Sequence, residues 1–300
     1  MSTANLLVEL FVEELPPKAL KKLGESFAQL LGDGLKAQGL TTDVSAVTPF
    51  ASPRRLAAHI SAVRSVAADQ SVSQKLMPVA VGLNAEGAPT PALLKKLAAL
   101  GADASVVPQL KRQPDGKAEA LFFDSVVPGV TLATGLQKAL DDAIAKLPIP
   151  KVMSYQLESG EQPGWRSVHF VRPVHGLVAL HGADVVPLAA LGLTSGRNTR
   201  GHRFEAPMDP VVLQHADRYA EQLAEQGAVI AGFADRQGEI ARQLQHAAAL
   251  EGLTPIDDAA LLDEVSALVE RPNVLLGRFE ASFLEVPQEC LILTMKANQK

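Results

Sequence analysis

The chain has 300 residues, a mass of 31.7 kDa and a formal net charge of −5, and 47% of its side chains are hydrophobic. This composition excludes a disordered chain, a collagen and a coiled-coil rod. No apolar run reaches the ~18 residues of a membrane span, and the acidic N-terminus lacks the basic region of a signal peptide. The single cysteine excludes an internal disulfide and a cysteine-cluster metal site. We therefore expect a soluble, cytoplasmic protein that does not contact a membrane.

Negative charge is concentrated in the second half of the chain. Residues 205–289 hold 5 basic and 16 acidic side chains, a net charge of −11. Such a surface repels the phosphate backbone of nucleic acids, so any RNA contact is expected elsewhere. The stretch 197–203 is the obvious place because it holds four basic side chains and no acid. These are Arg197, Arg200, His202 and Arg203.

The beginning of the chain predicts a strand, a helix and a second strand. Residues 6–12 are a mostly apolar run of strand length. Pro16-Pro17 then stop the strand and open a helix, whose apolar residues step by three or four until Gly39 ends it. Residues 56–62 show the imperfect alternation of a strand.

The next segment predicts two capped helices and a hairpin. Thr90 precedes a proline and caps a helix that runs to Leu100. Strand-like runs at 106–111 and 118–125 are joined by Pro-Asp-Gly, which favours a hairpin. Thr131 caps a further helix that ends at Leu147, whereas residues 65–90 carry only weak signals.

The Pro-Ile-Pro break at 148–150 is the best candidate linker in the sequence. We expect an N-terminal α+β domain over residues 1–150 and a second α+β domain over residues 151–300. The second domain begins with the polar turn GEQPGW at 160–165. Its expected strands are 168–171, 174–180, 185–191, 229–230 and 273–279, and its expected helices are 217–225, 234–250, 258–269 and one from Pro287 onward.

Strands and helices mix without strict alternation, which favours an α+β fold over a doubly wound nucleotide-binding sheet. The sequence contains no phosphate-binding Walker loop, dinucleotide fingerprint, G-x-S-x-G elbow or H-E-x-x-H motif.

His169, His175 and His181 recur every six residues and would share one face of an unbroken strand, but Pro173 interrupts it, so we expect structural or surface histidines. Cys290 lies in the apolar pattern of a predicted helix and is interpreted as a core thiol. We therefore predict no catalytic residue and no metal site.

Three polar groups remain as candidate sites. Glu13-Glu14 precede the first helix, where carboxylates favour its dipole. Arg54-Arg55 stand beside a proline turn that enters a strand, where the two side chains would face opposite ways. They form an internal ion pair or contact RNA or another subunit. The basic, glycine-rich loop 192–204 offers hydroxyls, amides and guanidinium groups to phosphate oxygens, or is held by the acids that follow it.

Seven motifs occur in a fixed order along the chain. They are VEELPPKAL (12–20), FASPRRLA (50–57), FVRPVHGLVAL (170–180), LGLTSGRNTRGHRF (191–204), DEVSALVERP (263–272), FLEVPQE (283–289) and MKANQK (295–300). Together they resemble the N-terminal part of the beta subunit of bacterial heterotetrameric glycyl-tRNA synthetase. The resemblance covers residues 6–300.

The resemblance implies a subunit more than twice this length, which continues into an HD-type domain and an anticodon-binding domain. It also implies partners: a class II alpha subunit that activates glycine with ATP and Mg²⁺, tRNA(Gly), and a second beta subunit in an assembly of two alpha and two beta chains. No cofactor is expected in this chain. The resemblance assigns no firm chemical role to the basic residues that keep the family pattern. These are Arg54, Arg55, Arg172, His175, Arg197, Arg200, His202 and Arg203.

We therefore expect a non-catalytic region of a synthetase subunit, inactive alone, that supports tRNA binding and assembly so that the alpha subunit can attach glycine to the tRNA 3′ end. One alternative is a protein–protein scaffold without RNA contact, which the net charge of −11 over residues 205–289 favours. A less favoured alternative is an editing-type hydrolase, for which no residue spacing marks a site.

Overall fold

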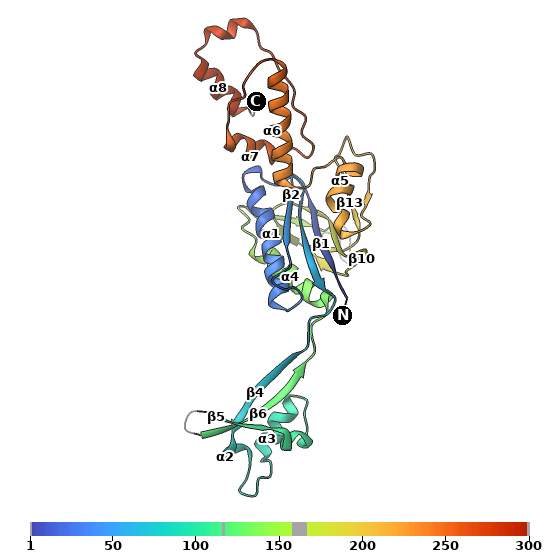
Figure 1. Ribbon diagram of the computed structural model, residues 1–300, viewed down its shortest axis with the longest axis vertical. Coiled ribbons are helices and arrows are strands. Elements are labelled where there is room, and N and C mark those ends of the chain that lie inside the picture. Colours follow the sequence, from blue (N-terminus) through green and yellow to red (C-terminus); the bar gives the residue numbers. More distant parts are fainter. Residues whose placement is uncertain (1, 116–117, 158–166, 299–300) are drawn as a thin grey trace. The chain divides into compact units, whose positions relative to one another are not determined.

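The computed structural model describes residues 2–115, 118–157 and 167–298, which form two compact units (Figure 1). Unit 1 comprises residues up to Val66 together with those from Thr131 onward, and unit 2 comprises Ala67–Val130. Both combine helices with antiparallel sheets, and the described residues contain no doubly wound sheet, so the expected α+β class is confirmed. None of the helices in the described residues has the length and apolar character needed to cross a membrane.

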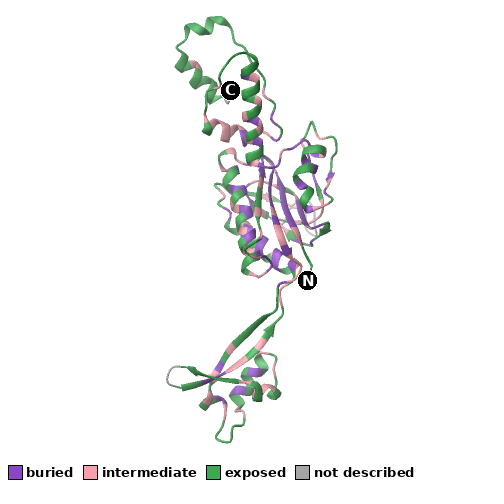
Figure 2. Cartoon of the chain, viewed as in Figure 1, coloured by how far each residue is buried: buried purple, intermediate pink, exposed green. Residues whose placement is uncertain are grey.

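A five-stranded antiparallel sheet forms the centre of unit 1. Its strand order is β10-β9-β1-β3-β2. The bounds are β1 Thr3–Val12, β2 Val47–Ser52, β3 Arg55–Arg64, β9 Val174–His181 and β10 Asp184–Val185. Strand β1 is central because it pairs with β3 on one side and with β9 on the other, Val8 lying opposite Ala58 and Ala179. Figure 2 shows the resulting concentration of buried residues along this sheet.

Two helices cover one part of the sheet. Helix α1 (Pro17–Ala37) packs on β2, β3 and α4 (Leu132–Lys146). The proline at its first turn fixes the backbone for helix initiation, and the buried stripe contains Leu23, Phe27 and Leu31. The two helices approach closely where Gly34 faces Ala139, since a Cβ added at Gly34 would lie 2.9 Å from the alanine Cβ.

Besides the packing of α1 on the sheet, a hydrophobic core forms between the sheet and α5, from alternate residues of β1 and β9. Leu7 and Leu180 pack with Tyr219 and Leu223, which belong to helix α5 (Tyr219–Gly227) that follows the short helix η2 (Ala216–Arg218). Residues of β1 alternate between the two faces. The acidic side chain of Glu9 therefore projects on the same face as Leu7, toward α5. This position makes Glu9 a buried charge.

The remaining elements of unit 1 are short strands and C-terminal helices. They are β7 Met153–Gln156, β8 Ser167–Phe170, β11 Ala189–Ala190, β12 Leu193–Thr194, β13 Asn198–Thr199, β14 Val211–Val212, α6 Phe233–Leu250, α7 Ala259–Ser266, η3 Ala281–Glu285 and α8 Gln288–Ala297. Helix α6 packs on α7.

Unit 2 is a three-stranded sheet with helices and its own small core. The strands, in the order β4-β6-β5, are Gln70–Pro78, Ala118–Val127 and Lys111–Asp115. The helices are α2 Val79–Gly82, α3 Pro91–Ala99 and η1 Ala104–Gln109. Leu76, Leu93, Leu97 and Leu121 form the core. At the junctions of the two units, Val66 forms a β-bridge with Thr131, and the Ala67 amide donates to the Val130 carbonyl at 2.9 Å.

The helices predicted from Pro16-Pro17 and from the caps at Thr90 and Thr131 are confirmed. The strand expected over 185–191 is not continuous, because β10 ends at Val185 and β11 contains only Ala189–Ala190. Residues 70–78, within the segment 65–90 that carried only weak signals, form β4. Residues 229–230 and 273–279 were predicted as strands and form none. Residues 106–109 of the expected strand 106–111 lie in η1, and Lys111 begins β5. Cys290 is exposed and not a core thiol. The GEQPGW turn lies outside the described residues.

The compact units differ from the expected division at residue 150. Strand β1 hydrogen-bonds to β9 along most of its length, so residues on both sides of that position share one sheet. The Pro-Ile-Pro break is instead a turn after α4 within unit 1. Proline fixes local backbone geometry, but it carries no information about which distant strands pair.

Candidate functional site

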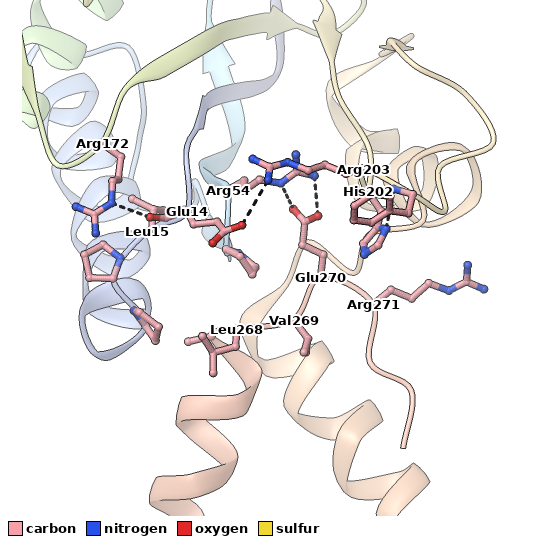
Figure 3. A pocket seen from close by; sticks show the side chains of 15 residues that line it. Glu14, Leu15, Arg54, Arg172, His202, Arg203, Leu268, Val269, Glu270 and Arg271 are labelled. Atoms are coloured by element: carbon pink, nitrogen blue, oxygen red, sulfur yellow. Dashed lines mark hydrogen bonds and ion pairs between the residues drawn. The ribbon is translucent and has the colours of Figure 1, made fainter. Parts of the chain in front are cut away.

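Five of the sequence motifs meet at one cleft in unit 1 (Figure 3). Glu13 and Glu14 follow β1, Arg54 lies in the turn between β2 and β3, and Arg172 precedes β9. The loop after β13 supplies residues 200–203, and the segment after α7 supplies residues 270–271. The cleft has two adjoining hollows of about 440 Å³ and 610 Å³. Both are lined by Arg54, His202 and Arg203.

The floor of the cleft is an ion pair between Arg54 and Glu270. Arg54 Nη2 lies 2.7 Å from Glu270 Oε2 and Nε lies 3.2 Å from Oε1, and both side chains are 7% exposed. Arg54 Nη2 also donates to the Gly201 carbonyl at 2.7 Å, and its guanidinium lies 5.3 Å from the ring centre of Phe11. Figure 3 shows the Glu270 carboxylate facing this guanidinium. Burial and two-point geometry fix the turn of Arg54 to the segment after α7.

Arg55 extends this network into the core. Its side chain is fully buried, and Nη1 donates to Glu270 Oε1 at 3.3 Å and to Ser52 Oγ at 3.2 Å. Nη2 donates to the carbonyl of Arg200. Arg55 Nε faces Glu9 Oε2 at 3.6 Å. The guanidinium therefore joins β1, β3, the loop after β13 and the segment after α7.

Glu9 is held by the hydroxyl of Tyr219, which donates to Oε2. Glu9 Oε1 is buried and has no hydrogen-bond partner among the described residues. Burial, together with the nearby Glu9 charge, raises the pKa of Tyr219 well above its ordinary value. The tyrosine therefore stays protonated and serves as a hydrogen-bond donor to the carboxylate.

A third buried arginine, Arg236 of α6, lies beyond the cleft. Its Nε and Nη2 donate to the Ser266 carbonyl at 3.1 and 3.0 Å, and its Nη1 donates to backbone carbonyls that include Ile230 at 2.8 Å. Burial and the neighbouring Arg55 charge lower the pKa of Arg236 to about 10. Arg236 thus joins α6 to the end of α7, which precedes Glu270.

The rim of the cleft carries exposed arginines paired with exposed acids. The side chains of Arg200, Arg203 and Arg271 are 65%, 49% and 56% exposed. Arg200 lies 3.3 Å from a carboxylate oxygen of Asp209. Arg203 lies 3.0 Å from Glu13 and 3.7 Å from Glu14, and Arg271 lies 3.1 Å from Glu205. In Figure 3, Arg271 extends away from Glu270.

His202 and Phe204 form the turn at the end of the basic loop. His202 Nδ1 accepts the backbone N–H groups of Phe204 at 3.3 Å and Glu205 at 3.2 Å. Because Nδ1 is an acceptor, the proton of the neutral ring lies on Nε2. The Phe204 side chain is 91% exposed, and its ring meets the His202 ring edge to face at 6.2 Å.

The structure brings six of the eight predicted residues to the two hollows. These are Arg54, Arg172, His175, Arg200, His202 and Arg203. Arg172 Nε donates to the Glu14 carbonyl at 2.9 Å, and His175 Nε2 lies 2.9 Å from Glu13 Oε1.

Arg55 and Arg197 line neither hollow. Arg197 Nη2 donates to the Ala183 carbonyl at 2.9 Å, so its side chain lies against the turn before β10 and not in the cleft. The expectation that Arg54 and Arg55 face opposite ways was wrong, because Arg54 belongs to the turn before β3 and both reach Glu270. The internal ion pair is the alternative that these contacts support.

The three evenly spaced histidines do not converge. His169 Nδ1 lies 2.8 Å from Ser154 Oγ, His181 Nε2 lies 2.8 Å from the Val63 carbonyl, and His175 contacts Glu13. Nowhere in the described ranges do three or more His, Cys, Asp or Glu side chains gather in a way that could hold a metal ion. These contacts support the structural interpretation of the histidines.

Sequence reasoning missed Glu9, Tyr219, Arg236 and Glu270 as members of the network. Glu9 carried a usable signal, because a carboxylate in the apolar run LLVELFV must be paired when the strand is buried. The other three gave no local signal, since their partners lie far away in sequence.

Comparison with known proteins agrees with the motifs. The family model described as "Glycyl-tRNA synthetase beta subunit" matches residues 6–300. The glycine–tRNA ligase beta subunits of Leptothrix cholodnii, Acidovorax ebreus and Thiobacillus denitrificans are 73%, 71% and 68% identical over 300, 303 and 300 residues. Each alignment covers 100% of this chain but 42% of the relative.

Proposed function

The chain belongs to the family of glycyl-tRNA synthetase beta subunits, and on that premise we propose that it supports tRNA(Gly) binding and assembly with an alpha subunit. That partner attaches glycine to the tRNA 3′ end with ATP and Mg²⁺. The relatives' name, "beta subunit", supports an assembly with a second kind of chain. The proposal assigns no catalytic residue to this region.

The observation that carries the RNA part of the proposal is the layered cleft. Its floor is the buried ion pair of Arg54 and Glu270, whereas its rim presents Arg200, Arg203 and Arg271 to solvent. Exposed ion pairs contribute little stability, so a phosphate can replace a carboxylate at small cost. A guanidinium also binds a phosphate through two parallel hydrogen bonds. The rim is therefore suited to contact an RNA backbone that approaches the cleft.

We would test this with a complete beta subunit carrying Arg200→Ala and Arg203→Ala, assembled with the alpha subunit. The matched control is Arg218→Ala with Arg242→Ala, which removes two arginines of similar exposure, 51% and 67%, outside the cleft. Binding of tRNA(Gly) is measured over a salt series. We expect weaker binding at low salt and a log–log salt slope reduced by roughly 0.7–0.9 for each lost phosphate contact.

Glycine activation by the alpha subunit, followed as ATP–pyrophosphate exchange without tRNA, should be unchanged in both assemblies. An unchanged salt slope in the cleft variant would remove the RNA contact from the proposal. If the cleft variant and the control lose the same affinity for tRNA(Gly), the loss is a general effect of net charge. That result would also remove the RNA contact from the proposal.

A scaffold without RNA contact is the second candidate. It is favoured by the pairing of each rim arginine with an acid of the same chain, such as Arg200 with Asp209 and Arg271 with Glu205. Light scattering coupled to size exclusion, with the 300-residue chain alone and mixed with the alpha subunit, tests the assembly part directly. Comigration would place an alpha-contact surface within these residues, and separate elution would place assembly elsewhere in the longer subunit.

A further inference from the structure

The most exposed aromatic side chain among the described residues stands on the rim of the cleft. Phe204 is 91% exposed, compared with 47% for Phe279 and 50% for Phe283. It lines the hollow of about 440 Å³ together with His202, Arg203 and Arg271. An apolar ring exposed to water is unfavourable, and a ligand that covers it would gain free energy. We therefore ask which ligand could bind to Phe204.

The turn that carries Phe204 is fixed by backbone contacts. The His202 amide donates to the Gly227 carbonyl at 2.7 Å, and the Ala206 amide donates to the His202 carbonyl at 3.2 Å. A Cβ at Gly201 would lie 2.5 Å from the Gly227 carbonyl oxygen, so the loop backbone lies directly against the end of α5. Together with the two N–H groups that donate to His202 Nδ1, these contacts fix the backbone that carries Phe204 before any ligand arrives.

Charged groups line the same hollow as Phe204. Arg203 and Arg271 are about half exposed on the same hollow. His202 Nε2–H has no hydrogen-bond partner among the described residues. The two acids that line this hollow are Glu14 and Glu270, and each faces an arginine, Glu14 facing Arg203 at 3.7 Å.

We propose that Phe204 is a stacking platform for one base of a single-stranded RNA segment, with adjoining phosphates on Arg203 and Arg271. An aromatic face beside guanidinium groups is the arrangement that binds unpaired nucleotides, because every base has a π-face. The hollow also lies within the size range of small-ligand sites, roughly 300–1,000 Å³. This inference rests on the proposed function, since it takes tRNA as the partner.

A protein partner would fit this surface less well. A phenylalanine that enters a protein pocket is usually surrounded by apolar residues that are buried with it, as in the centre of a stable interface. Here the hollow that Phe204 lines combines apolar residues such as Leu15, Leu268 and Val269 with the guanidinium groups of Arg203 and Arg271. The ring partner of Phe204 is His202. The structure therefore favours a ligand with alternating flat apolar and anionic groups, which is the chemistry of a nucleic-acid strand.

The experiment compares Phe204→Ala, Phe204→Leu and Phe204→Trp in the complete synthetase, with Leu250→Ala as a control at another exposed apolar site, 75% exposed. Affinity for tRNA(Gly) is measured over the same salt series. Phe204→Ala and Phe204→Leu should weaken binding by about 5- to 150-fold with the salt slope unchanged, because a neutral stack releases no counterions. Phe204→Trp and the control should bind as the unchanged protein does.

The Phe204→Trp variant gives a second readout. A short single-stranded RNA should quench its added tryptophan fluorescence, whereas a duplex of the same length should not, with the signal of the chain's own Trp165 subtracted by using the unchanged protein. No quenching by the single strand would overturn the stacking role.

Two binding results would also overturn it. Full affinity in Phe204→Leu with a loss in Phe204→Ala would indicate an apolar protein contact. Full affinity in all three variants would show that the ring does not contact tRNA. If the variant lacking Arg200 and Arg203 still shows a reduced salt slope, the proposed function stands while this inference fails.

Discussion

The floor and the rim of the cleft use the same side chain for opposite purposes. Arg54 on the floor and Arg55 in the core behind it are 7% and 0% exposed and are held by carboxylates and backbone carbonyls. Arg200 and Arg203 on the rim are 65% and 49% exposed, and their acid partners are also exposed. Loss of a partner on the floor leaves a charge without solvent, whereas loss on the rim leaves a hydrated charge. Depth alone therefore separates a structural arginine from one that is available for binding.

The largest expected effect comes from removing the charge of Arg55. Arg55→Met replaces the guanidinium with an uncharged side chain of similar length. Glu9 then has no cation beside it, and Glu270 keeps only its ion pair with Arg54. We expect the free energy of unfolding to fall by about 3–5 kcal/mol, as is typical when one member of a buried ion pair is lost. Urea titration followed by circular dichroism measures this loss.

The double variant Arg55→Met with Glu9→Gln sharpens the same comparison, because it neutralises one of the two charges left behind. It should recover part of the lost stability. A double variant that is no more stable than Arg55→Met would contradict the account of Glu9 as a charge compensated by Arg55.

A smaller effect is expected from the hydroxyl of Tyr219. Tyr219→Phe removes the hydrogen bond to Glu9 Oε2, while the other oxygen of Glu9 is already without a described partner. The free energy of unfolding should fall by roughly 1–3 kcal/mol, because a buried acceptor is left unsatisfied. Tyr155→Phe is the comparison, because the hydroxyl of this partly exposed tyrosine makes only a long hydrogen bond, 3.3 Å, from the Val174 amide. Equal losses at both positions would refute a special role for the buried hydroxyl of Tyr219.

On the rim, Arg203→Met makes the same chemical change as Arg55→Met. Its effect on the free energy of unfolding should stay within about 0.5 kcal/mol, since its partners Glu13 and Glu14 remain hydrated. The same urea titration provides the measurement. A loss as large as that of Arg55→Met would show that the rim is part of the structural network and would break the comparison.

The smallest effect concerns Asp217, a half-exposed carboxylate outside the cleft. A hydrogen bond from Asn5, followed by one from His59, holds the pKa of Asp217 below its usual 3.8, against the opposing effect of partial burial. Its stabilising contribution is therefore complete above pH 3.8 and is lost as the pH falls through the lower folded-state value. Asp217→Asn should flatten the fall of stability below pH 3.8 in acid titrations of thermal unfolding. An unchanged acid slope would contradict the depressed pKa.

Local chemistry in the sequence was enough to predict much of the fold. The proline pair at Pro16-Pro17, the caps at Thr90 and Thr131 and the apolar run 6–12 each act within a few residues, and the corresponding elements are present. The strand predicted over 273–279 failed because an apolar run indicates burial only if something covers it, and Leu275 is 80% exposed.

The candidate site was only partly predictable for the same reason. Clusters of basic residues were visible, but their depth depends on pairing between β1, β3 and β9 and on a segment that arrives after α7. Glu270, which holds both Arg54 and Arg55, lies 216 and 215 residues from them in sequence. A single sequence without pairing information gives no means of choosing that partner for them.

The connection between Val66 and Thr131 has a consequence for how this protein can vary. Because those two residues form a bridge and the Leu132 amide donates to the Ser65 carbonyl at 2.8 Å, the chain leaves β3 and returns to α4 at adjacent backbone positions. A short turn can close the same gap, and the entropic cost of a longer excursion grows only slowly with its length. The segment Ala67–Val130 is therefore an insertion between β3 and α4. Changes in its length or its replacement by a short turn would leave the register of the central sheet unchanged.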